Sequence, residues 1–153
     1  MSVVNLQQFL STNRESMNIA LKSIEMLAEK KERVRIVSSI TEEVPVLYKE
    51  KIEEEILIIN KLSEIYTVYF EVLNDMQFIV SLKDKINTIN FNLSSEQLNL
   101  IQSILTDNLK TRNDGKNVLI KEIQVLEEKL EKLSKERRNF VDNILKRKET
   151  VTT

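Results

Sequence analysis

The stretch from Ile56 to Ile89, ILIINKLSEIYTVYFEVLNDMQFIVSLKDKINTI, is the most apolar part of the chain and decides its fold. Its apolar residues recur at steps of three and four, which places them on two sides of one helix. The first stripe comprises Ile59, Leu62, Tyr66, Tyr69, Leu73, Met76 and Val80. The second comprises Ile58, Ile65, Val68, Val72, Ile79, Leu82, Ile86 and Ile89. A helix with two apolar sides is covered on both, so this segment is predicted to lie at the centre of a bundle.

The composition agrees with a helical fold. The chain has 153 residues but only one glycine and one proline, whereas β-rich domains spend many of both on turns. Its length suits one domain, and its richness in Ile, Leu, Lys and Glu is typical of bundles and coiled coils. We therefore predict an all-α fold in a single domain spanning residues 1–153. It would be an elongated antiparallel bundle of three or four long helices with coiled-coil-like packing.

The expected helices cover residues of about 10–37, 42–89, 95–111 and 116–148. The first break falls at 38–45, where Ser and Thr residues precede Pro45, which disfavours helical backbone at the residue before it. The best-specified start follows Leu93, because Ser94 and Gln97 have the spacing of a capping box.

The third and fourth expected helices are separated by Asn113-Asp114-Gly115, a strong turn sequence. Apolar residues are absent from Lys110 to Asn117, so none offsets the roughly 1 kcal/mol that glycine costs inside a helix. A turn is the preferred interpretation. The alternative is one long helix that continues through a solvated polar stretch.

The last segment carries a regular heptad seam of Leu119, Ile123, Leu126, Leu130, Leu133, Arg137, Phe140 and Ile144. A parallel two-stranded coil would bring together no opposite-charge pair at its flanking positions and would place Arg137 in its interface. We therefore expect the seam to pack antiparallel on the central helix of its own chain. This favours a monomer over a dimer.

Most catalytic chemistry is excluded by composition. The chain has no cysteine and no histidine, which removes thiolate and imidazole chemistry, and one glycine cannot build a phosphate-binding loop. Glu53-Glu54-Glu55 is interpreted as a solvated acidic face, because three consecutive helical residues point in three directions. No enzyme activity, cofactor, catalytic residue or metal site is predicted.

The sequence also bears on location. The first ten residues have neither a basic start nor a sustained apolar core, so no signal peptide is expected. The most apolar window is interrupted by charged residues, so no transmembrane span is expected either. A cytoplasmic protein is the resulting expectation.

Protein binding is the function class that remains. Small all-helical proteins of this composition recur among export and assembly chaperones, adaptors and inhibitors, and we predict a non-catalytic module that binds another protein through helical surfaces. The predicted partner-binding residues are Arg137, Phe140, Ile144 and Arg147. One alternative is a nucleic-acid-binding protein that uses this basic segment, although a net charge of −1 disfavours it. The other is a structural, self-assembling coiled coil.

Overall fold

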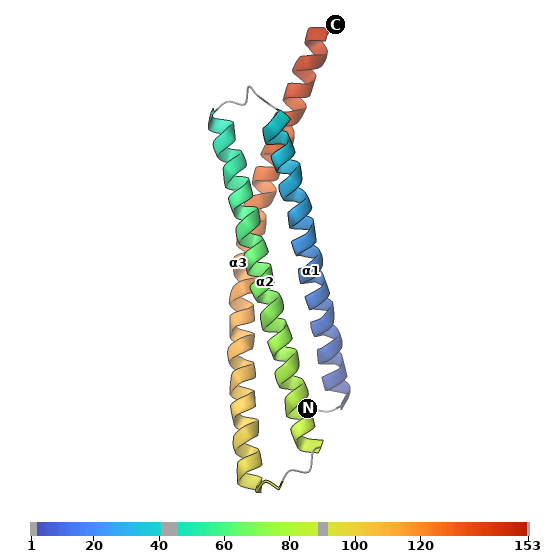
Figure 1. Ribbon diagram of the computed structural model, residues 1–153, viewed down its shortest axis with the longest axis vertical. Coiled ribbons are helices and arrows are strands. Elements are labelled where there is room, and N and C mark those ends of the chain that lie inside the picture. The colour runs from blue at the N-terminus through green and yellow to red at the C-terminus, as the bar shows by residue number, and fades with distance from the viewer. Residues whose placement is uncertain (1–2, 41–45, 89–91, 153) are drawn as a thin grey trace. The chain divides into compact units, whose positions relative to one another are not determined.

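Three long helices make up the structure, a computed structural model that describes residues 3–40, 46–88 and 92–152 (Figure 1). They are α1 (Val3–Ile40), α2 (Val46–Thr88) and α3 (Ser95–Thr152). The residues described include no strand, and the helices pack against one another. The predicted all-α helical bundle is therefore confirmed. No helix in these ranges combines the length and apolar character needed to cross a membrane.

The packing divides into two compact units, each built from a segment of every helix. Unit 1 comprises Met1–Lys22 and Tyr66–Lys121, and unit 2 comprises Ser23–Ile65 and Glu122–Thr153. In each unit α2 runs antiparallel to α1 and α3. The prediction of a single domain stays a prediction.

Unit 1 is held together by a core contributed mainly by α2, whose buried side chains include Leu73, Met76 and Val80. From α1, Asn13 is buried among them, and its Nδ2 donates a hydrogen bond to the carbonyl of Leu73 at 2.9 Å. By contrast, α3 contributes no fully buried residue between Ser95 and Lys121. In unit 1, α3 therefore covers the core while keeping much of its own apolar surface accessible.

Unit 2 has a core to which all three helices contribute. The buried apolar residues are Leu27 and Val34 from α1, Ile52, Ile58, Ile59 and Leu62 from α2, and Ile123, Leu126 and Leu130 from α3. Those of α3 belong to the predicted heptad seam. The seam is thus closed inside one chain against an antiparallel α2, as expected.

The preferred turn at Asn113-Asp114-Gly115 is wrong, because α3 is continuous from Ser95 to Thr152. Asn113 and Lys116 are half-buried and occupy seam positions that the sequence leaves without apolar residues. Gly115 is exposed, has no positive φ, and a Cβ placed on it would meet nothing within 4 Å. The packing on both sides of Gly115 outweighs the roughly 1 kcal/mol that glycine costs in a helix.

The helix boundaries correct the prediction in a second place. The first helix begins at Val3 rather than near residue 10. Leu6 and Phe9 are half-buried and lie at helical spacing before the buried Asn13, so the packed side of the helix extends towards its start. The predicted start of the second helix near residue 42 and its end at Ile89 lie outside the described residues.

The capping box at the start of α3 is confirmed. The backbone N–H of Gln97 donates to Ser94 Oγ at 3.2 Å, and the backbone N–H of Ser94 donates to Gln97 Oε1 at 3.0 Å. This reciprocal pair satisfies two backbone donors that a helix start leaves without intrahelical partners. It fixes where α3 begins.

Candidate functional site

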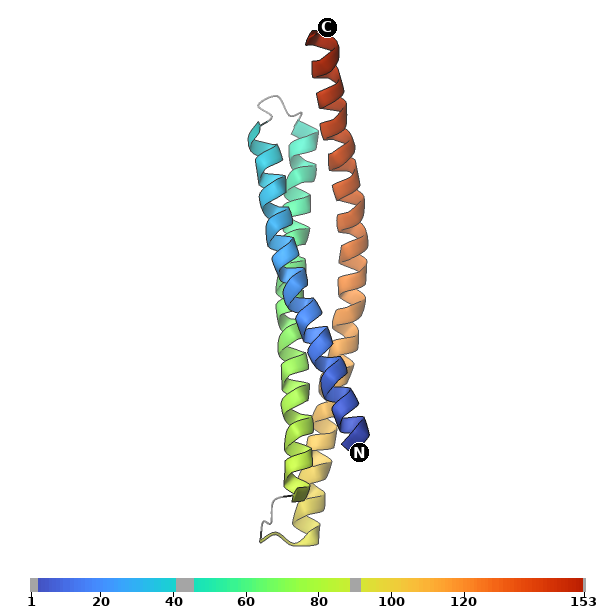
Figure 2. The ribbon, with the colours of Figure 1, turned by 90° about the vertical axis from the view of Figure 1, so that its right-hand side faces the viewer.

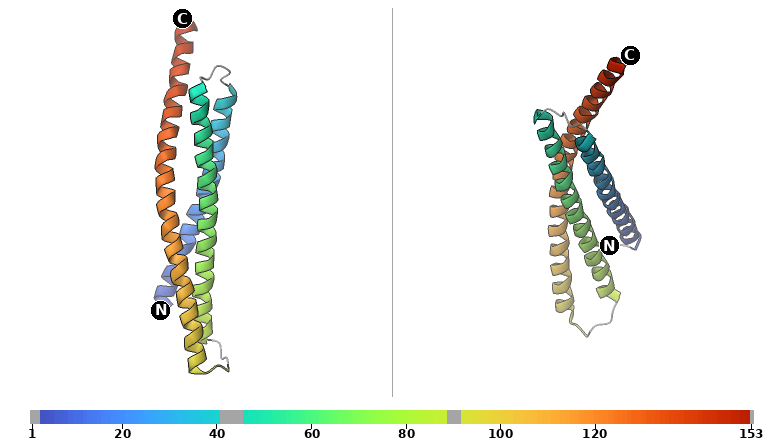
Figure 3. Two further views of the ribbon diagram at one scale, coloured as in Figure 1. Left: turned by 90° about the vertical axis from the view of Figure 1, so that its left-hand side faces the viewer. Right: turned by 45° about the horizontal axis from the view of Figure 1, so that its top comes forward.

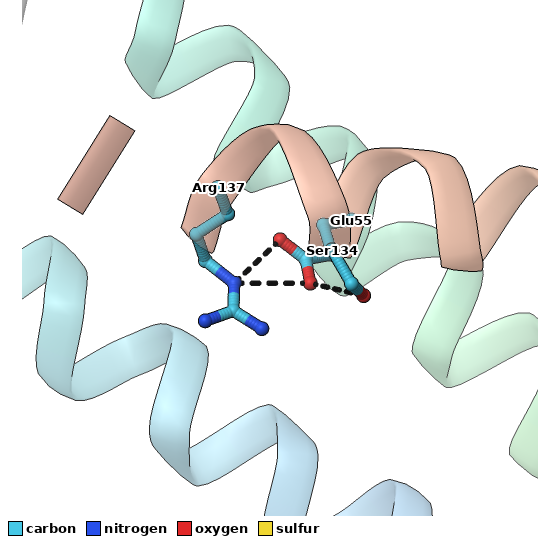
Figure 4. A network of polar contacts seen from close by, with 3 residues as sticks. All are labelled: Glu55, Ser134 and Arg137. Atoms are coloured by element: carbon cyan, nitrogen blue, oxygen red, sulfur yellow. Dashed lines mark hydrogen bonds and ion pairs between the residues drawn. The ribbon is translucent and has the colours of Figure 1, made fainter. Parts of the chain in front are cut away.

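The predicted partner-binding residues lie towards the C-terminal end of α3 in unit 2, next to a buried polar cluster (Figure 4). Its centre is Glu55 of α2, whose side chain is only 1% exposed. Ser134 Oγ donates to Glu55 Oε1 at 3.0 Å. Arg137 Nε lies 3.2 Å from Oε1 and 3.1 Å from Oε2 of the same carboxylate. We call Glu55, Ser134 and Arg137 the polar lock.

The polar lock occupies core positions of both helices. Glu55 lies three residues after Ile52 and four before Ile59, on the buried side of α2. Arg137 follows Ile123 and Leu130 at heptad spacing, so the seam itself points its side chain inward. The carboxylate meets an opposite charge and a hydroxyl donor, which offset the cost of removing it from water.

Glu55 corrects the interpretation of the three consecutive glutamates. Glu53 and Glu54 are exposed, as a solvated acidic face requires, but Glu55 is buried in the polar lock. Its position was readable from the sequence, because it continues the three-and-four spacing of the apolar stripes. A buried carboxylate is costly unless a cation pairs with it, and Arg137 of the heptad seam supplies that cation.

Two further ionisable side chains lie near the polar lock. The pKa of Lys30 is lowered, chiefly because burial disfavours the ammonium, and Arg137 adds to this effect while Glu55 opposes it. Burial, and then the negative charge of Glu55, raises the pKa of the Tyr48 phenol to about 12. Lys30 thus brings α1 into the electrostatics of the cluster.

Phe140 also faces inward. Its ring stacks on that of Tyr48 with centroids 3.6 Å apart and planes inclined by 16°. At the edge of the cluster, Lys51 Nζ pairs with Glu136 Oε2 at 3.1 Å, and both of these side chains are more than one-third exposed. These pairs and the polar lock follow one antiparallel register between α2 and α3.

The structure therefore divides the four predicted partner-binding residues. Arg137 and Phe140 contact α2, and Arg137 keeps only 13% of its side chain exposed. Ile144 is half-buried. Arg147 belongs to α3, but its side chain lies outside the part of the chain whose side chains are described. Arg137, a member of the polar lock, and Phe140 thus make contacts with α2 that leave little of either side chain for a partner.

The accessible part of this end of α3 consists of other residues. Leu145 is 54% exposed, Arg138 is exposed, and both lie in unit 2. The last turns of α3 extend past the neighbouring ends of α1 and α2 (Figure 3). The sequence reasoning missed Leu145 because it lies off the heptad seam. The sequence did indicate that Leu145 could be exposed, because it is an apolar residue outside an otherwise regular heptad seam.

Two surface hollows are lined mainly by polar and charged side chains. One, of about 300 Å³, lies in unit 2 between α2 and α3 and is lined by Lys51, Glu54, Lys129, Lys132, Leu133 and Glu136. The other, of about 600 Å³, lies along α1 in unit 1 and includes Arg14, Glu15 and Lys22. Small-molecule sites are typically enclosed, whereas both hollows are open to solvent.

Comparison with known proteins adds no family to this picture. No family model, curated protein or solved structure matches the chain. The function is therefore argued from the surfaces that the helices present.

Proposed function

We propose that the chain is a non-catalytic protein-binding module, an adaptor, chaperone or inhibitor, that binds a helical segment of another protein at the C-terminal end of α3. The observation that carries the proposal is the exposure of Leu145, seven residues before the end of α3 at Thr152. The last turns of α3 extend past the other two helices of its unit (Figure 3). An amphipathic helix from a partner packs on such a surface by covering its apolar side chains.

The basic residues around Leu145 also support a binding surface at this end of α3. Arg138 precedes it, and the sequence continues as Lys146-Arg147-Lys148. A partner with acidic residues beside its apolar stripe would complement these cations, which favours encounter more than it strengthens the final complex. The absence of cysteine and histidine from the sequence is the reason for proposing binding rather than catalysis.

The proposal is tested by affinity capture with the full chain and a matched pair of variants. Leu145→Asp places a charge on the proposed surface, whereas Leu57→Asp changes a comparably exposed leucine, 67% accessible, on α2 of the same unit. Partners of the wild-type chain are expected to be retained by Leu57→Asp and weakened more than about tenfold by Leu145→Asp. Equal retention by both variants, with helicity unchanged, would contradict the proposed surface.

The nucleic-acid alternative is weakened by the polar lock. Arg137, one of the cations on which it depends, is largely buried against Glu55. A nucleic-acid complex loses affinity steeply as salt rises, because binding releases condensed counterions. Strong DNA retention at moderate salt that depends on Arg138 and Lys146 would favour this alternative over protein binding.

A further inference from the structure

The two halves of α1 are held in different ways. In unit 1, Asn13 Nδ2 donates a hydrogen bond to the carbonyl of Leu73 on α2 at 2.9 Å. In unit 2, α1 runs antiparallel to α2 and in the same direction as α3 (Figure 2). Among the described residues, no side chain from Ile24 to Arg35 makes a hydrogen bond or ion pair with α2 or α3. We call residues 24–35 the α1 strap, which is held by apolar packing.

The apolar packing of the α1 strap is interrupted near its middle. Its fully buried side chains are Leu27, which is 8% exposed, and Val34, which is 0% exposed. Lys30 lies three residues after Leu27 and four before Val34, on the same side of the helix, and is half-buried. Lys31 beside it is half-buried as well. Long cationic side chains thus occupy the strap between its two apolar anchors.

Lys30 approaches a cluster whose carboxylate already has a cation. Arg137 Nε lies 3.1 Å from Glu55 Oε2. Burial disfavours the Lys30 ammonium most, Glu55 favours it, Arg137 disfavours it, and Glu131 and Arg138 act weakly in opposite directions. The net result is a lowered pKa, so the ammonium is less stable in the closed chain than in water. Packing of the α1 strap is therefore weaker while Lys30 carries its charge.

The other two helices of unit 2 are joined without α1. The polar lock connects α2 to α3, and so do the pair of Lys51 with Glu136 and the stack of Tyr48 on Phe140. None of these contacts includes a residue of α1. Separation of the α1 strap would leave all of them in place.

We propose that the α1 strap opens from α2 and α3 as one segment, while α2 and α3 stay paired, and that the half-buried Lys30 favours this opening. Segments with few contacts to their neighbours open locally at a lower free energy than the whole domain unfolds. Opening places Lys30 in water and uncovers the apolar surface on which Leu27 and Val34 pack. The inference concerns a motion of α1 and goes beyond the proposed function, which rests on Leu145 of α3.

Thiol labelling tests the inference, because the chain has no cysteine and one introduced thiol reports its own exposure. Val34→Cys lies in the α1 strap, and Ala20→Cys is its control on α1 of unit 1. Both original side chains are small, apolar and 0% exposed. A thiol reagent should label Val34→Cys more than about tenfold faster than Ala20→Cys. Equal rates would overturn the inference, because they would mean that both thiols are exposed by the same unfolding.

A second substitution in the Val34→Cys chain tests the role of Lys30. Lys30→Met removes the charge but keeps an unbranched apolar chain, so it should slow labelling more than about threefold. Lys129→Met changes an exposed lysine on α3 of the same unit and should alter the rate by less than about twofold. Labelling of Lys30→Met that is unchanged or faster would also overturn the inference.

Hydrogen exchange of the unmodified chain guards against effects of the introduced cysteines. Amide protection should be uniform across residues 27–34 and lower than across residues 13–20 of α1 in unit 1. Protection that declines steadily towards Ile40 would indicate fraying of a helix end and would contradict opening as one segment. None of these results depends on Leu145, so failure here and failure of the proposed function can be told apart.

Discussion

Units 1 and 2 each bury a polar side chain between helices, but with different chemistry. In unit 1, Asn13 is neutral, and its Nδ2 donates to a backbone carbonyl and approaches Gln77 Oε1 at 3.5 Å. In unit 2, the carboxylate side chain of Glu55 accepts hydrogen bonds from the side chains of Ser134 and Arg137. The backbone acceptor in unit 1 is present whatever the side chains are. The cation in unit 2 can be removed by one substitution, so the two units should respond very differently to loss of a partner.

The largest effect is expected for Arg137→Met. It leaves Glu55 buried without a counter-charge, which costs about 3–5 kcal/mol of the free energy of unfolding. Urea denaturation followed by circular dichroism measures the loss. Lys51→Met is the matched control, because it breaks the exposed pair with Glu136 in the same unit and should cost less than about 1 kcal/mol. Equal losses of unfolding free energy in Arg137→Met and Lys51→Met would show that the buried ion pair stabilises the fold no more than the exposed one.

A smaller loss is expected for Asn13→Ala in unit 1. The variant removes the hydrogen bonds from Asn13 of α1 to Leu73 and Gln77 of α2 and leaves no buried charge, so it should cost about 1–2 kcal/mol. The same denaturation experiment applies. A loss as great as that of Arg137→Met would remove the contrast between the neutral and the ionic contact.

Gly115→Ala should stabilise unit 1 by about 0.5–1 kcal/mol. Gly115 lies within α3, and the added methyl group meets open space, so the higher helix propensity of alanine is gained without a clash. Thermal melting provides the measurement. A fall in melting temperature would instead favour the turn that the sequence indicated at residues 113–115.

A further effect is confined to alkaline pH. Because the pKa of Tyr48 is raised to about 12 in the folded chain, the folded state keeps a proton that the unfolded state loses above its ordinary pKa of about 10. The free energy of unfolding should therefore fall as pH rises from 10 to 12. The lowered pKa of Lys30 acts in the opposite direction, and only below 10.5. Tyr48→Phe should show a shallower decline than wild type between pH 10.5 and 12, and identical declines would contradict this assignment.

The fold could be predicted from the sequence because the apolar residues that indicate it recur at helical spacing. The double stripe of Ile56–Ile89 and the heptads from Leu119 repeat often enough to indicate which sides of the helices are buried. Local chemistry also sufficed at Ser94 and Gln97, whose side chains bond to nearby backbone. The turn at Gly115 failed for the opposite reason, since local propensity there is outweighed by packing of α3 on both sides.

The candidate site was less predictable because its contacts join residues distant in sequence. Glu55 and Arg137 are 82 positions apart, and their pairing depends on the register of α2 against α3. That register also stacks Phe140 on Tyr48. Leu145, which lies outside the heptad seam, is exposed instead.

A double-mutant cycle on Glu55 and Arg137 is the most direct test of the polar lock as an interdependent buried pair. Glu55→Leu and Arg137→Met are made singly and together, and the free energy of unfolding of each is measured in urea. We predict large losses for the single variants and a double variant close to wild type, with a coupling energy of about 3 kcal/mol or more. Additive losses would contradict the account, because they would mean that the two side chains contribute independently.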